Sequence, residues 1–319
     1  MMEAEIGRDL ERARALLLAG ELVAIPTETV YGLAGNALDT EVVAKIFDAK
    51  ERPHFDPLIV HIDSVRNLPK CASQLPSWAE TLSARFWPGP LTLVLPKRES
   101  VPDLTTAGLP TVGLRVPRHP LTIELLKGLP FPLAAPSANP FGYVSPTTPE
   151  HVFAQLGHRI KYILDGGACE IGIESTIVGE REGKPVILRL GGTSIEAIQE
   201  VLRDFEIVRK GDILAPGMYQ SHYAPRVALI LGEPEEPQSN YSALRFKEPL
   251  PELDLNHQVI LSPSGDLHEA AANLFKAMRQ LDEMEGIDLI FAELVPDDGL
   301  GRAINDRLKR ASVLSVEKA

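Results

Sequence analysis

The chain has 319 residues, of which 44% are hydrophobic, so it is long and apolar enough for two packed domains. Its formal net charge of −12 argues against a broad surface that binds a nucleic-acid backbone, because such binding depends on clustered Lys and Arg. No apolar run has transmembrane length, and the charged N-terminus lacks a secretory pattern. Cys71 and Cys169 show neither metal-ligand spacing nor a disulfide pattern, which suits the cytoplasm.

Strand-like and helical segments are mixed through the first two thirds of the chain. We expect a helix over 8–19, a strand at 22–26, and a helix over 40–49 with Thr40 as its N-cap. Further strands are expected at 57–62, 91–95, 111–116, 131–135, 160–164, 175–179 and 185–190, and helices at 76–85, 119–127, 149–156 and 194–203. This spacing predicts an α/β domain over residues 1–209.

The remainder of the chain reads as a linker followed by a smaller domain. Residues 210–226 contain Pro and Gly without a helical or strand period, which is typical of a linker, although so long a segment can also be a functional loop. Strands are expected at 227–232, 258–262 and 287–294, irregular structure at 233–256, and helices at 266–284 and 302–312. Residues 227–319 therefore predict a second α/β domain.

Four polar segments follow predicted strands, where open α/β sheets build their binding sites. Threonine hydroxyls in PTETVYGL can bind an amino acid or a sugar, or simply form a capping turn. Lys50 and Arg52 can both reach one polyanion, or they can lie at a solvated helix C-terminus. The loop AAPSANPFGYVSPTT can approach a phosphate through its backbone or be a plain turn region. The fourth segment is GIESTI, at 172–177.

Buried cations need partners, and the predicted strands contain two of them. Arg115 and Arg189 require either a carboxylate of the protein or an anionic ligand. His61 lies in an apolar run, where it can be a core residue or a ligand-binding one. Phosphate-loop, dinucleotide-binding, serine-hydrolase and zinc motifs are absent from the sequence. The residues alone predict an α/β protein with an anion pocket rich in basic and hydroxyl groups.

Taken in order, these segments resemble the YrdC-like family of threonylcarbamoyl-AMP synthases. The matching stretches are PTETVYGL, KERP with DPLIVHI, FWPGPLTLVL, GLPTVGLRVP, PLAAPSAN, SPTTPEHV, DGGACEIGIESTIV and ILRLG. APGMYQSHYAP and GLGRAINDRLKRA resemble the linker and the C-terminal domain of two-domain members. The resemblance implies a twisted mixed sheet with a concave basic cavity, residues 210–226 as a lid, and a smaller Rossmann-like α/β domain.

The resemblance also implies an activity. ATP, bicarbonate and L-threonine would give threonylcarbamoyl-AMP and pyrophosphate, with Mg²⁺ accompanying ATP and no metal site built by the protein. A separate transferase would then use the product to form threonylcarbamoyladenosine in tRNA, so strong direct nucleic-acid binding is not expected.

Two sets of residues follow from the matching positions. Lys50 and Arg52 are expected to stabilise charge during adenylyl transfer, and His222 and Tyr223 to exclude water. The role of Asp56 is open, because a carboxylate repels phosphates unless Mg²⁺ lies between them. The implied L-threonine set is Thr29, His61, Arg115, Ala135 and Ser175. The implied ATP set is Lys50, Arg52, Asp56, Thr111, Ser137, Ser145, Arg189, His222 and Tyr223.

Two other functions compete with this interpretation. A YrdC-like basic cavity could instead serve an RNA-binding maturation factor, which the acidic composition disfavours. Carbamoyl-adenylate enzymes of hydrogenase maturation use a similar domain but carry additional zinc-binding cysteines that this chain lacks.

Overall fold

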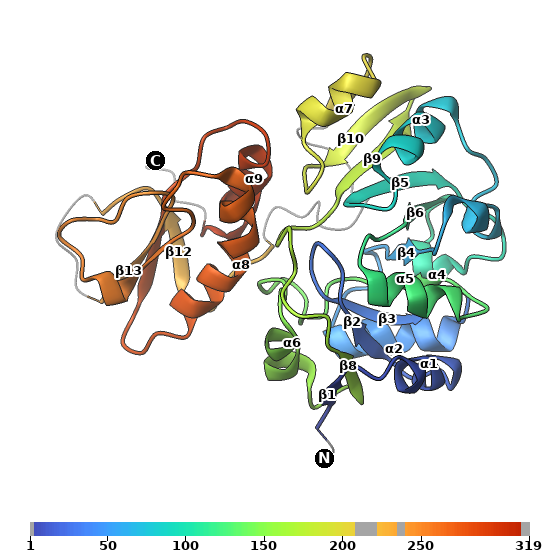
Figure 1. Cartoon of the computed structure of the whole chain (residues 1–319), viewed down its shortest axis with the longest axis horizontal. Coiled ribbons are helices and arrows are strands. Elements are labelled where there is room, and N and C mark those ends of the chain that lie inside the picture. The colour runs from blue at the N-terminus through green and yellow to red at the C-terminus, as the bar shows by residue number, and fades with distance from the viewer. Residues whose placement is uncertain (1–2, 208–221, 235–239, 314–319) are drawn as a thin grey trace. The chain divides into compact units, whose positions relative to one another are not determined.

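A computed structural model describes residues 3–207, 222–234 and 240–313 (Figure 1). The predicted linker at 210–226 lies mostly outside these residues. The chain forms two compact units, in which two short loops from the first two thirds of the sequence belong to the second unit. Unit 1 is Met1–Phe141, Pro146–Glu170 and Glu174–Met218, and unit 2 is Gly142–Ser145, Ile171–Ile173 and Tyr219–Ala319.

Unit 1 is built on an eleven-stranded mixed sheet in the order β1-β8-β2-β3-β7-β4-β6-β5-β9-β10-β11. Its strands are β1 (Glu5–Gly7), β2 (Val23–Ile25), β3 (Gly32–Asn36), β4 (Ile59–His61), β5 (Leu91–Pro96), β6 (Thr111–Arg115), β7 (Leu133–Ala134), β8 (Tyr162–Leu164), β9 (Thr176–Arg181), β10 (Lys184–Arg189) and β11 (Glu206–Ile207). Its helices are α1 (Leu10–Leu18), α2 (Thr40–Lys50), η1 (Val65–Lys70), α3 (Ser77–Phe86), α4 (Asp103–Thr106), α5 (Pro120–Lys127), α6 (Pro149–Leu156) and α7 (Ile195–Val201).

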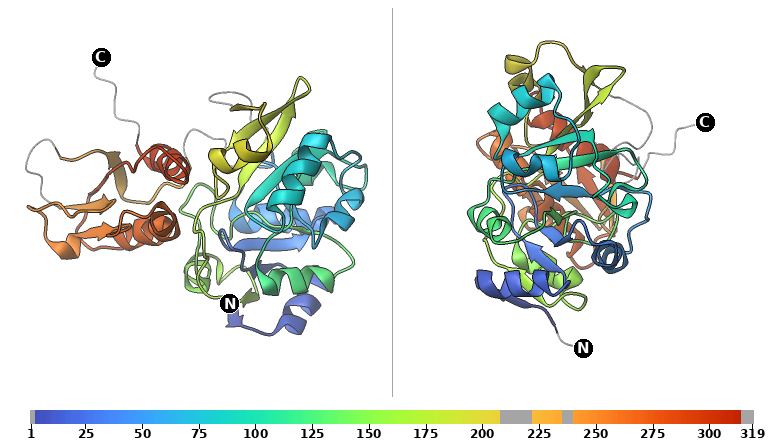
Figure 2. Two further views of the ribbon diagram at one scale, coloured as in Figure 1. Left: turned by 45° about the horizontal axis from the view of Figure 1, so that its top comes forward. Right: turned by 90° about the vertical axis from the view of Figure 1, so that its right-hand side faces the viewer.

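Helices cover the two faces of this sheet unequally. One face packs on α2, α3, α6 and α7 in the largest core cluster, which includes Val42, Leu82 and Leu114. Helices lie along the sheet of unit 1 in Figures 1 and 2. The opposite face is covered by α1 and α5 around β2, β3, β7 and β8. Beyond β7 that second face carries only a small cluster centred on Ile59 and Ile177, to which no described helix contributes. Polar side chains can therefore occupy this half of the sheet.

Unit 2 contains a four-stranded parallel sheet in the order β12-β15-β13-β14, on which helices α8 and α9 pack (Figure 1). Its elements are β12 (Ala228–Leu231), β13 (Tyr241–Arg245), η2 (Leu255–His257), β14 (Gln258–Ile260), α8 (Leu267–Asp282), β15 (Leu289–Ala292) and α9 (Gly301–Ala311). The large mixed sheet and the second, smaller α/β fold predicted from the sequence are confirmed. None of the described helices is long and apolar enough to span a membrane.

Several local predictions are wrong. Residues 233–256 were expected to be irregular but contain β13, a fully buried interior strand paired with both β14 and β15. The N-cap of α2 is Asp39 rather than Thr40, because the Asp39 carboxylate accepts the N–H groups of Glu41 and Val42. Strand β3 was not predicted because its sequence, GLAGN, has little β-propensity. Its Gly35 allows close packing, since a Cβ there would lie 2.7 Å from Val42.

Candidate active site

Strand register gathers polar side chains on the half of the sheet whose small apolar cluster contains no residue of a described helix. Parallel pairing places His61 of β4 beside Arg115 of β6. Because side chains alternate along a strand, Thr111 and Arg115 share one face, with Gly113 between them. Ile59 of β4 lies on this face in the small apolar cluster. The sequence-predicted His61 and Arg115 are thus neighbours, whereas Thr111 lies four residues, about 13 Å, along the strand.

A β-bulge directs Arg189 toward the same face. The register of β10 against β9 shifts between Ile187 and Arg189, so that Arg189 lies opposite Ile177. The Arg189 guanidinium donates to the backbone carbonyl of Ser175 at 2.8 Å and to its hydroxyl at 3.2 Å. That hydroxyl lies 2.8 Å from the hydroxyl of Thr92. Bulges of this kind re-aim side chains, and here the bulge brings Arg189 to Ser175.

Arg115 is held by a buried network in which Glu28 is the residue that sequence reasoning missed. Its Nη1 donates to the Thr29 hydroxyl at 2.9 Å, and its Nε to the Gly89 carbonyl at 3.2 Å. Its Nη2 lies 2.7 Å from a carboxylate oxygen of Glu28. Burial opposes ionisation of Glu28, but Arg115 together with backbone hydrogen bonds, among them the Arg118 N–H at 3.0 Å, outweighs it, and the pKa of Glu28 is lowered. The signal for Glu28 was present, since it lies in PTETVYGL beside Thr29.

The turn that carries Glu28 and Thr29 is closed by Thr27. The Thr27 hydroxyl accepts the backbone N–H groups of Thr29 and Val30, each at 3.2 Å. Side-chain hydrogen bonds of this type replace backbone ones in tight turns. The turn leads into strand β3 and not into a helix, so the capping alternative for these threonines is wrong. Its effect is to present Thr29 to Arg115.

His61 is a buried, neutral imidazole. Burial, reinforced by the charge of Arg115, lowers its pKa from 6.5 to about 3. Its Nδ1 has no well-aligned hydrogen-bond partner among the described residues, although backbone groups of Ile59 and Leu133 lie close enough to interact with the ring. A buried polar atom without a partner is costly, so this nitrogen marks a position at which a ligand group would be stabilised. Ala135 lies close by, since its N–H donates to the Ile59 carbonyl at 3.0 Å.

A free thiol lies near the Glu28–Arg115 pair. Cys169 is buried. Its thiol interacts with the backbone of Thr27 through a hydrogen bond and lies within range of the charges of Glu28 and Arg115. Burial raises the pKa of this thiol well above its usual range. Cys71, by contrast, lies in the largest core cluster, and burial raises its pKa to about 11.

Three basic side chains surround the Asp56 carboxylate. Arg52 Nη2 lies 2.7 Å from Asp56 Oδ2, and the charges of Lys50 and Arg189 also act on this carboxylate. Burial nevertheless raises the pKa of Asp56, and burial, then the charge of Arg52, lowers that of Lys50 well below its usual range. Three basic side chains therefore act on one buried carboxylate, and Arg52 is the one in direct contact with it. This arrangement suits a polyanionic ligand.

Lys50 and Arg52 are positioned by the end of α2. Glu51 adopts a left-handed conformation with φ of 53°, which ends the helix and turns the chain toward Asp56. The Lys50 ammonium donates to the backbone carbonyls of Ser137 and Asn139. Lys50 is only 1% exposed and Arg52 only 7%, so the alternative of a solvated helix C-terminus is wrong. The contact with Ser137 ties this cation to the predicted small-residue loop.

Three residues of the implied ATP set belong to unit 2, namely Ser145, His222 and Tyr223. The Tyr223 ring stacks on Phe275 at 5.5 Å between centroids, and Arg307 lies 5.5 Å from its centroid. Tyr223 is 1% exposed. Its side chain therefore anchors residue 223 in the core of unit 2, a structural task that the sequence did not indicate.

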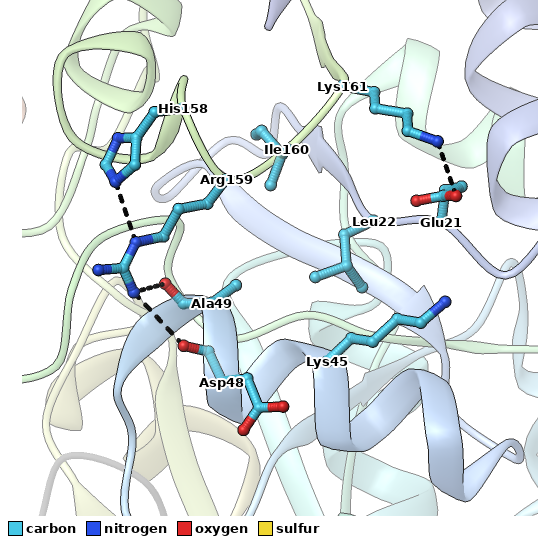
Figure 3. Close-up of a pocket in the computed structure, with 9 residues that line it drawn as sticks. All are labelled: Glu21, Leu22, Lys45, Asp48, Ala49, His158, Arg159, Ile160 and Lys161. Atoms are coloured by element: carbon cyan, nitrogen blue, oxygen red, sulfur yellow. Dashed lines mark hydrogen bonds and ion pairs between the residues drawn. The ribbon is translucent and has the colours of Figure 1, made fainter. Parts of the chain in front are cut away.

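A separate pocket of about 570 Å³ is lined by none of the predicted residues (Figure 3). Its cationic side chains have partners within the chain. Lys161 pairs with Glu21 at 2.7 Å, Arg159 pairs with Glu51, and Lys45 donates to the Gly20 carbonyl at 2.8 Å. Charge pairing of this kind leaves little attraction for an anion, so we do not assign the active site to this pocket.

Two protein families match the chain in succession. The family described as "Telomere recombination" matches residues 15–191, and that described as "Threonylcarbamoyl-AMP synthase, C-terminal domain" matches residues 193–313. Together these two matches span most of both units.

Full-length relatives show the same correspondence. A threonylcarbamoyl-AMP synthase of Pyrococcus abyssi is 42% identical over 96% of this chain and 94% of its own. One of Bacillus subtilis is 41% identical over 95% and 92%. The crystal structure of P. abyssi Sua5 complexed with L-threonine superposes with a TM-score of 0.88 at 39% identity, covering 98% of this chain and 97% of that one.

Proposed function

The chain belongs to the threonylcarbamoyl-AMP synthase family, and on that premise we propose that it condenses ATP, bicarbonate and L-threonine into threonylcarbamoyl-AMP and pyrophosphate. The observation that carries this proposal is the pairing of two kinds of site in unit 1. One combines Arg115 with the neutral His61, and the other combines Lys50, Arg52 and Arg189 around Asp56. The first suits an amino acid and the second a nucleotide polyphosphate.

At the amino-acid end, Arg115 would bind the threonine carboxylate. Within the described residues, three of its five N–H groups face Thr29, Gly89 and Glu28, and the other two can bind a ligand. A planar fork held by such a network matches a carboxylate well. The unpartnered Nδ1 of His61 would then face the threonine amine or the carbamate formed from it. Thr29, Ala135 and Ser175 would complete this end.

At the nucleotide end, the basic residues would stabilise charge on the phosphates. A carbamate oxygen would attack the α-phosphorus of ATP, forming the P–O bond of the mixed anhydride while the bond to pyrophosphate breaks. Lys50, Arg52 and Arg189 would stabilise the negative charge that develops on the departing pyrophosphate. Ser137, Thr111 and Ser145 would contribute hydroxyl or backbone contacts. Holding both reactants in line supplies much of the remaining catalysis.

We propose that Mg²⁺ enters with ATP. No group of three His, Cys, Asp or Glu side chains within the described ranges is arranged to hold a metal. Mg²⁺ commonly keeps several waters and binds substrate phosphates with only one or two carboxylates. Asp56 at the nucleotide end already pairs with Arg52 at 2.7 Å, so the ion would be held mainly by the phosphates and water. The ion would supply further neutralisation of phosphate charge.

The product is a reactive mixed anhydride and requires a consumer. We propose that a separate transferase takes the threonylcarbamoyl group to adenosine in tRNA, and that both steps occur in the cytoplasm. His222 would limit hydrolysis of the anhydride by excluding water, and the buried Tyr223 ring would contribute only by anchoring this segment of the chain.

Pyrophosphate release tests the proposed reaction. Purified protein is given ATP, Mg²⁺ and bicarbonate with each of the twenty amino acids in turn. We expect release with L-threonine and its loss when bicarbonate is omitted. Absence of release with every amino acid would contradict the proposal.

A salt titration of RNA binding separates the competing function. An RNA-binding factor would show affinity that falls steeply with salt as phosphate contacts are lost. For a synthase of net charge −12 we expect weak RNA binding at every salt concentration.

A further inference from the structure

The amino-acid end of unit 1 is centred on the ion pair of Glu28 with Arg115, and both partners are buried. Glu28 is 3% exposed and Arg115 is 4% exposed. One carboxylate oxygen of Glu28 lies 2.7 Å from Nη2 of Arg115, and the other accepts the Arg118 N–H at 3.0 Å. The pair has no net charge, and because it is buried, solvent screens it little from a ligand bound beside it.

The charge of Glu28 acts on three further side chains, and all three are uncharged near pH 7. They are His61 of β4, His119 at the start of α5, and Cys169. Burial lowers the pKa of both imidazoles below the ordinary value, and it raises the pKa of the Cys169 thiol well above its usual range. None of these side chains therefore balances the charge of a ligand at pH 7 or above.

Ionised side chains further from the pair act elsewhere. Arg118 pairs with Glu170 at 2.7 Å, and both side chains are more than half exposed, so solvent screens their charges. The three cations of the nucleotide end act on Asp56. The charge that acts on a ligand at the amino-acid end is therefore determined mainly by Glu28 and Arg115.

A ligand carboxylate bound by Arg115 would share one guanidinium with Glu28. Two carboxylates on one guanidinium lie within the range of about 4–6 Å over which like charges disfavour each other. Together they would leave one negative charge uncompensated in a buried site, which is costly. The neutral His61 cannot supply the missing positive charge. A ligand that carries a cation next to its own carboxylate restores the balance.

We propose that Glu28 is a specificity-determining residue, whose carboxylate makes the site select a zwitterionic amino acid over an acid that lacks the amine. This inference rests on the proposed function, in which Arg115 binds the threonine carboxylate. Specificity often comes from an element that repels the wrong ligand, and the Glu28 carboxylate is such an element for a simple anion. The same carboxylate holds Arg115, so one residue both positions the guanidinium and determines which ligand it accepts.

Calorimetric binding of two ligands to the full-length chain tests this proposal. L-threonine is the zwitterion, and (R)-3-hydroxybutanoate has the same carboxylate and hydroxyl without the amine. We expect wild type to bind threonine at least about tenfold more tightly, and Glu28→Gln to reduce this ratio by about tenfold or more. An unchanged ratio in a folded Glu28→Gln, or equal affinity of wild type for the two ligands, would overturn the proposal.

Two other variants separate the charge of Glu28 from its shape and its surroundings. Glu170→Gln is the matched control, because it removes an exposed carboxylate near the same site, and the ratio should not change. Glu28→Asp keeps the charge on a shorter side chain, so it should keep most of the preference for threonine. A loss as large as that in Glu28→Gln would show that the shape of the side chain is responsible and would refute the charge role.

Failure of this inference differs from failure of the proposed function. If wild type binds neither ligand, the assignment of Arg115 to threonine is wrong, and this inference is wrong with it. If threonine binds and the ratio does not depend on Glu28, only the specificity role is wrong.

A measurement on wild type covers the case in which Glu28→Gln does not fold. Raising the pH through the pKa of the threonine amine converts the zwitterion into an anion of the same shape. His61, His119 and Cys169 keep their charge states in this range. The affinity for threonine should fall at least about fivefold by one pH unit above that pKa, and a constant affinity would refute the proposal.

Discussion

The Glu28–Arg115 pair shows how a buried charge can serve both stability and binding. Removing one partner of such a pair leaves the other uncompensated, at a cost of about 3–5 kcal/mol. We therefore expect Arg115→Ala to lower the free energy of unfolding and to raise the KM for threonine far more than that for ATP. Urea unfolding and pyrophosphate-release kinetics measure the two effects. The double variant Glu28→Gln with Arg115→Met should recover stability but not threonine binding; equal KM shifts for both substrates would contradict the assignment.

At the nucleotide end, Lys50 is expected to contribute both to the stability of the fold and to catalysis. Lys50→Met keeps the stem but removes the ammonium that binds the carbonyls of Ser137 and Asn139. Losing a group that stabilises phosphate charge should lower kcat/KM for ATP at least about a hundredfold. The two carbonyls left unpaired should cost about 1–3 kcal/mol in urea unfolding. Turnover equal to that of the unaltered enzyme would exclude Lys50 from catalysis.

His61 should make stability depend on pH. Its folded pKa of about 3 lies below its ordinary value of 6.5, so the unfolded chain takes up a proton first as the pH falls. The contribution of neutral His61 to the free energy of unfolding is fully present above pH 6.5 and is lost as the pH falls toward 3. At pH 5 the free energy of unfolding is lower by about 2 kcal/mol. Urea unfolding of wild type and His61→Gln between pH 5 and 7.5 measures it. Identical pH slopes for the two proteins would show that His61 is not buried in its neutral form.

At the residue scale, the sequence identified the cations better than their partners. That Arg115 and Arg189 each need a partner follows from their place in apolar strands. The partners differ, however, since Arg115 faces the Glu28 carboxylate whereas Arg189 donates to Ser175. Which partner is used depends on strand register and on the bulge in β10, and neither can be read from one sequence.

The start of helix α2 offers a test at the scale of an element. Asp39→Ala removes the side chain that accepts two backbone N–H groups, which should destabilise unit 1 by about 1 kcal/mol. Kinetic constants should stay unchanged, because Lys50 at the far end of α2 is held by loop carbonyls. Thermal unfolding and pyrophosphate release measure both. Glu41→Ala, in the same turn but without a capping bond, should have a smaller effect, and a larger one would contradict the capping role of Asp39.

Elements with strong periodicity were predicted well, and those made by tertiary pairing were not. Helices α2 and α8 carry clear apolar stripes and lie close to their predicted ranges. Strands β3 and β13 are short and lack an apolar run, and their neighbours in the sheet determine their conformation. The motif PTETVYGL was recognised as a loop, but strand β3, which begins at its Gly32, was not.

For the whole molecule, the main expectation concerns truncation. A chain ending at residue 209 keeps Lys50, Arg52 and Arg115 but loses α8, on which Gly142–Ser145 packs. We expect this fragment to fold, as judged by circular dichroism, and to release pyrophosphate at least about tenfold more slowly at limiting ATP. Full activity of the fragment would show that unit 2 is dispensable for catalysis.

The two-unit organisation followed from chain length and element order. The assignment of two loops from the first two thirds of the chain to unit 2 did not. Residues 142–145 and 171–173 lie inside the predicted first domain and belong to unit 2. A Cβ on Gly172 would lie 2.5 Å from the Cα of Ala272, so this close approach requires glycine. Contacts across a hundred residues of sequence leave no periodic signal, and only the folded structure reveals them.

The placement of the two cysteines gives the protein an internal reporter of local opening. Both thiols are buried, so an alkylating reagent can modify only molecules that have transiently opened. Cys169 lies beside the Glu28–Arg115 pair, whereas Cys71 belongs to the main core. The alkylation rate of Cys169 relative to that of Cys71 would therefore report local opening near the proposed threonine site separately from global unfolding. Threonine that binds there would slow the first rate and leave the second as a reference.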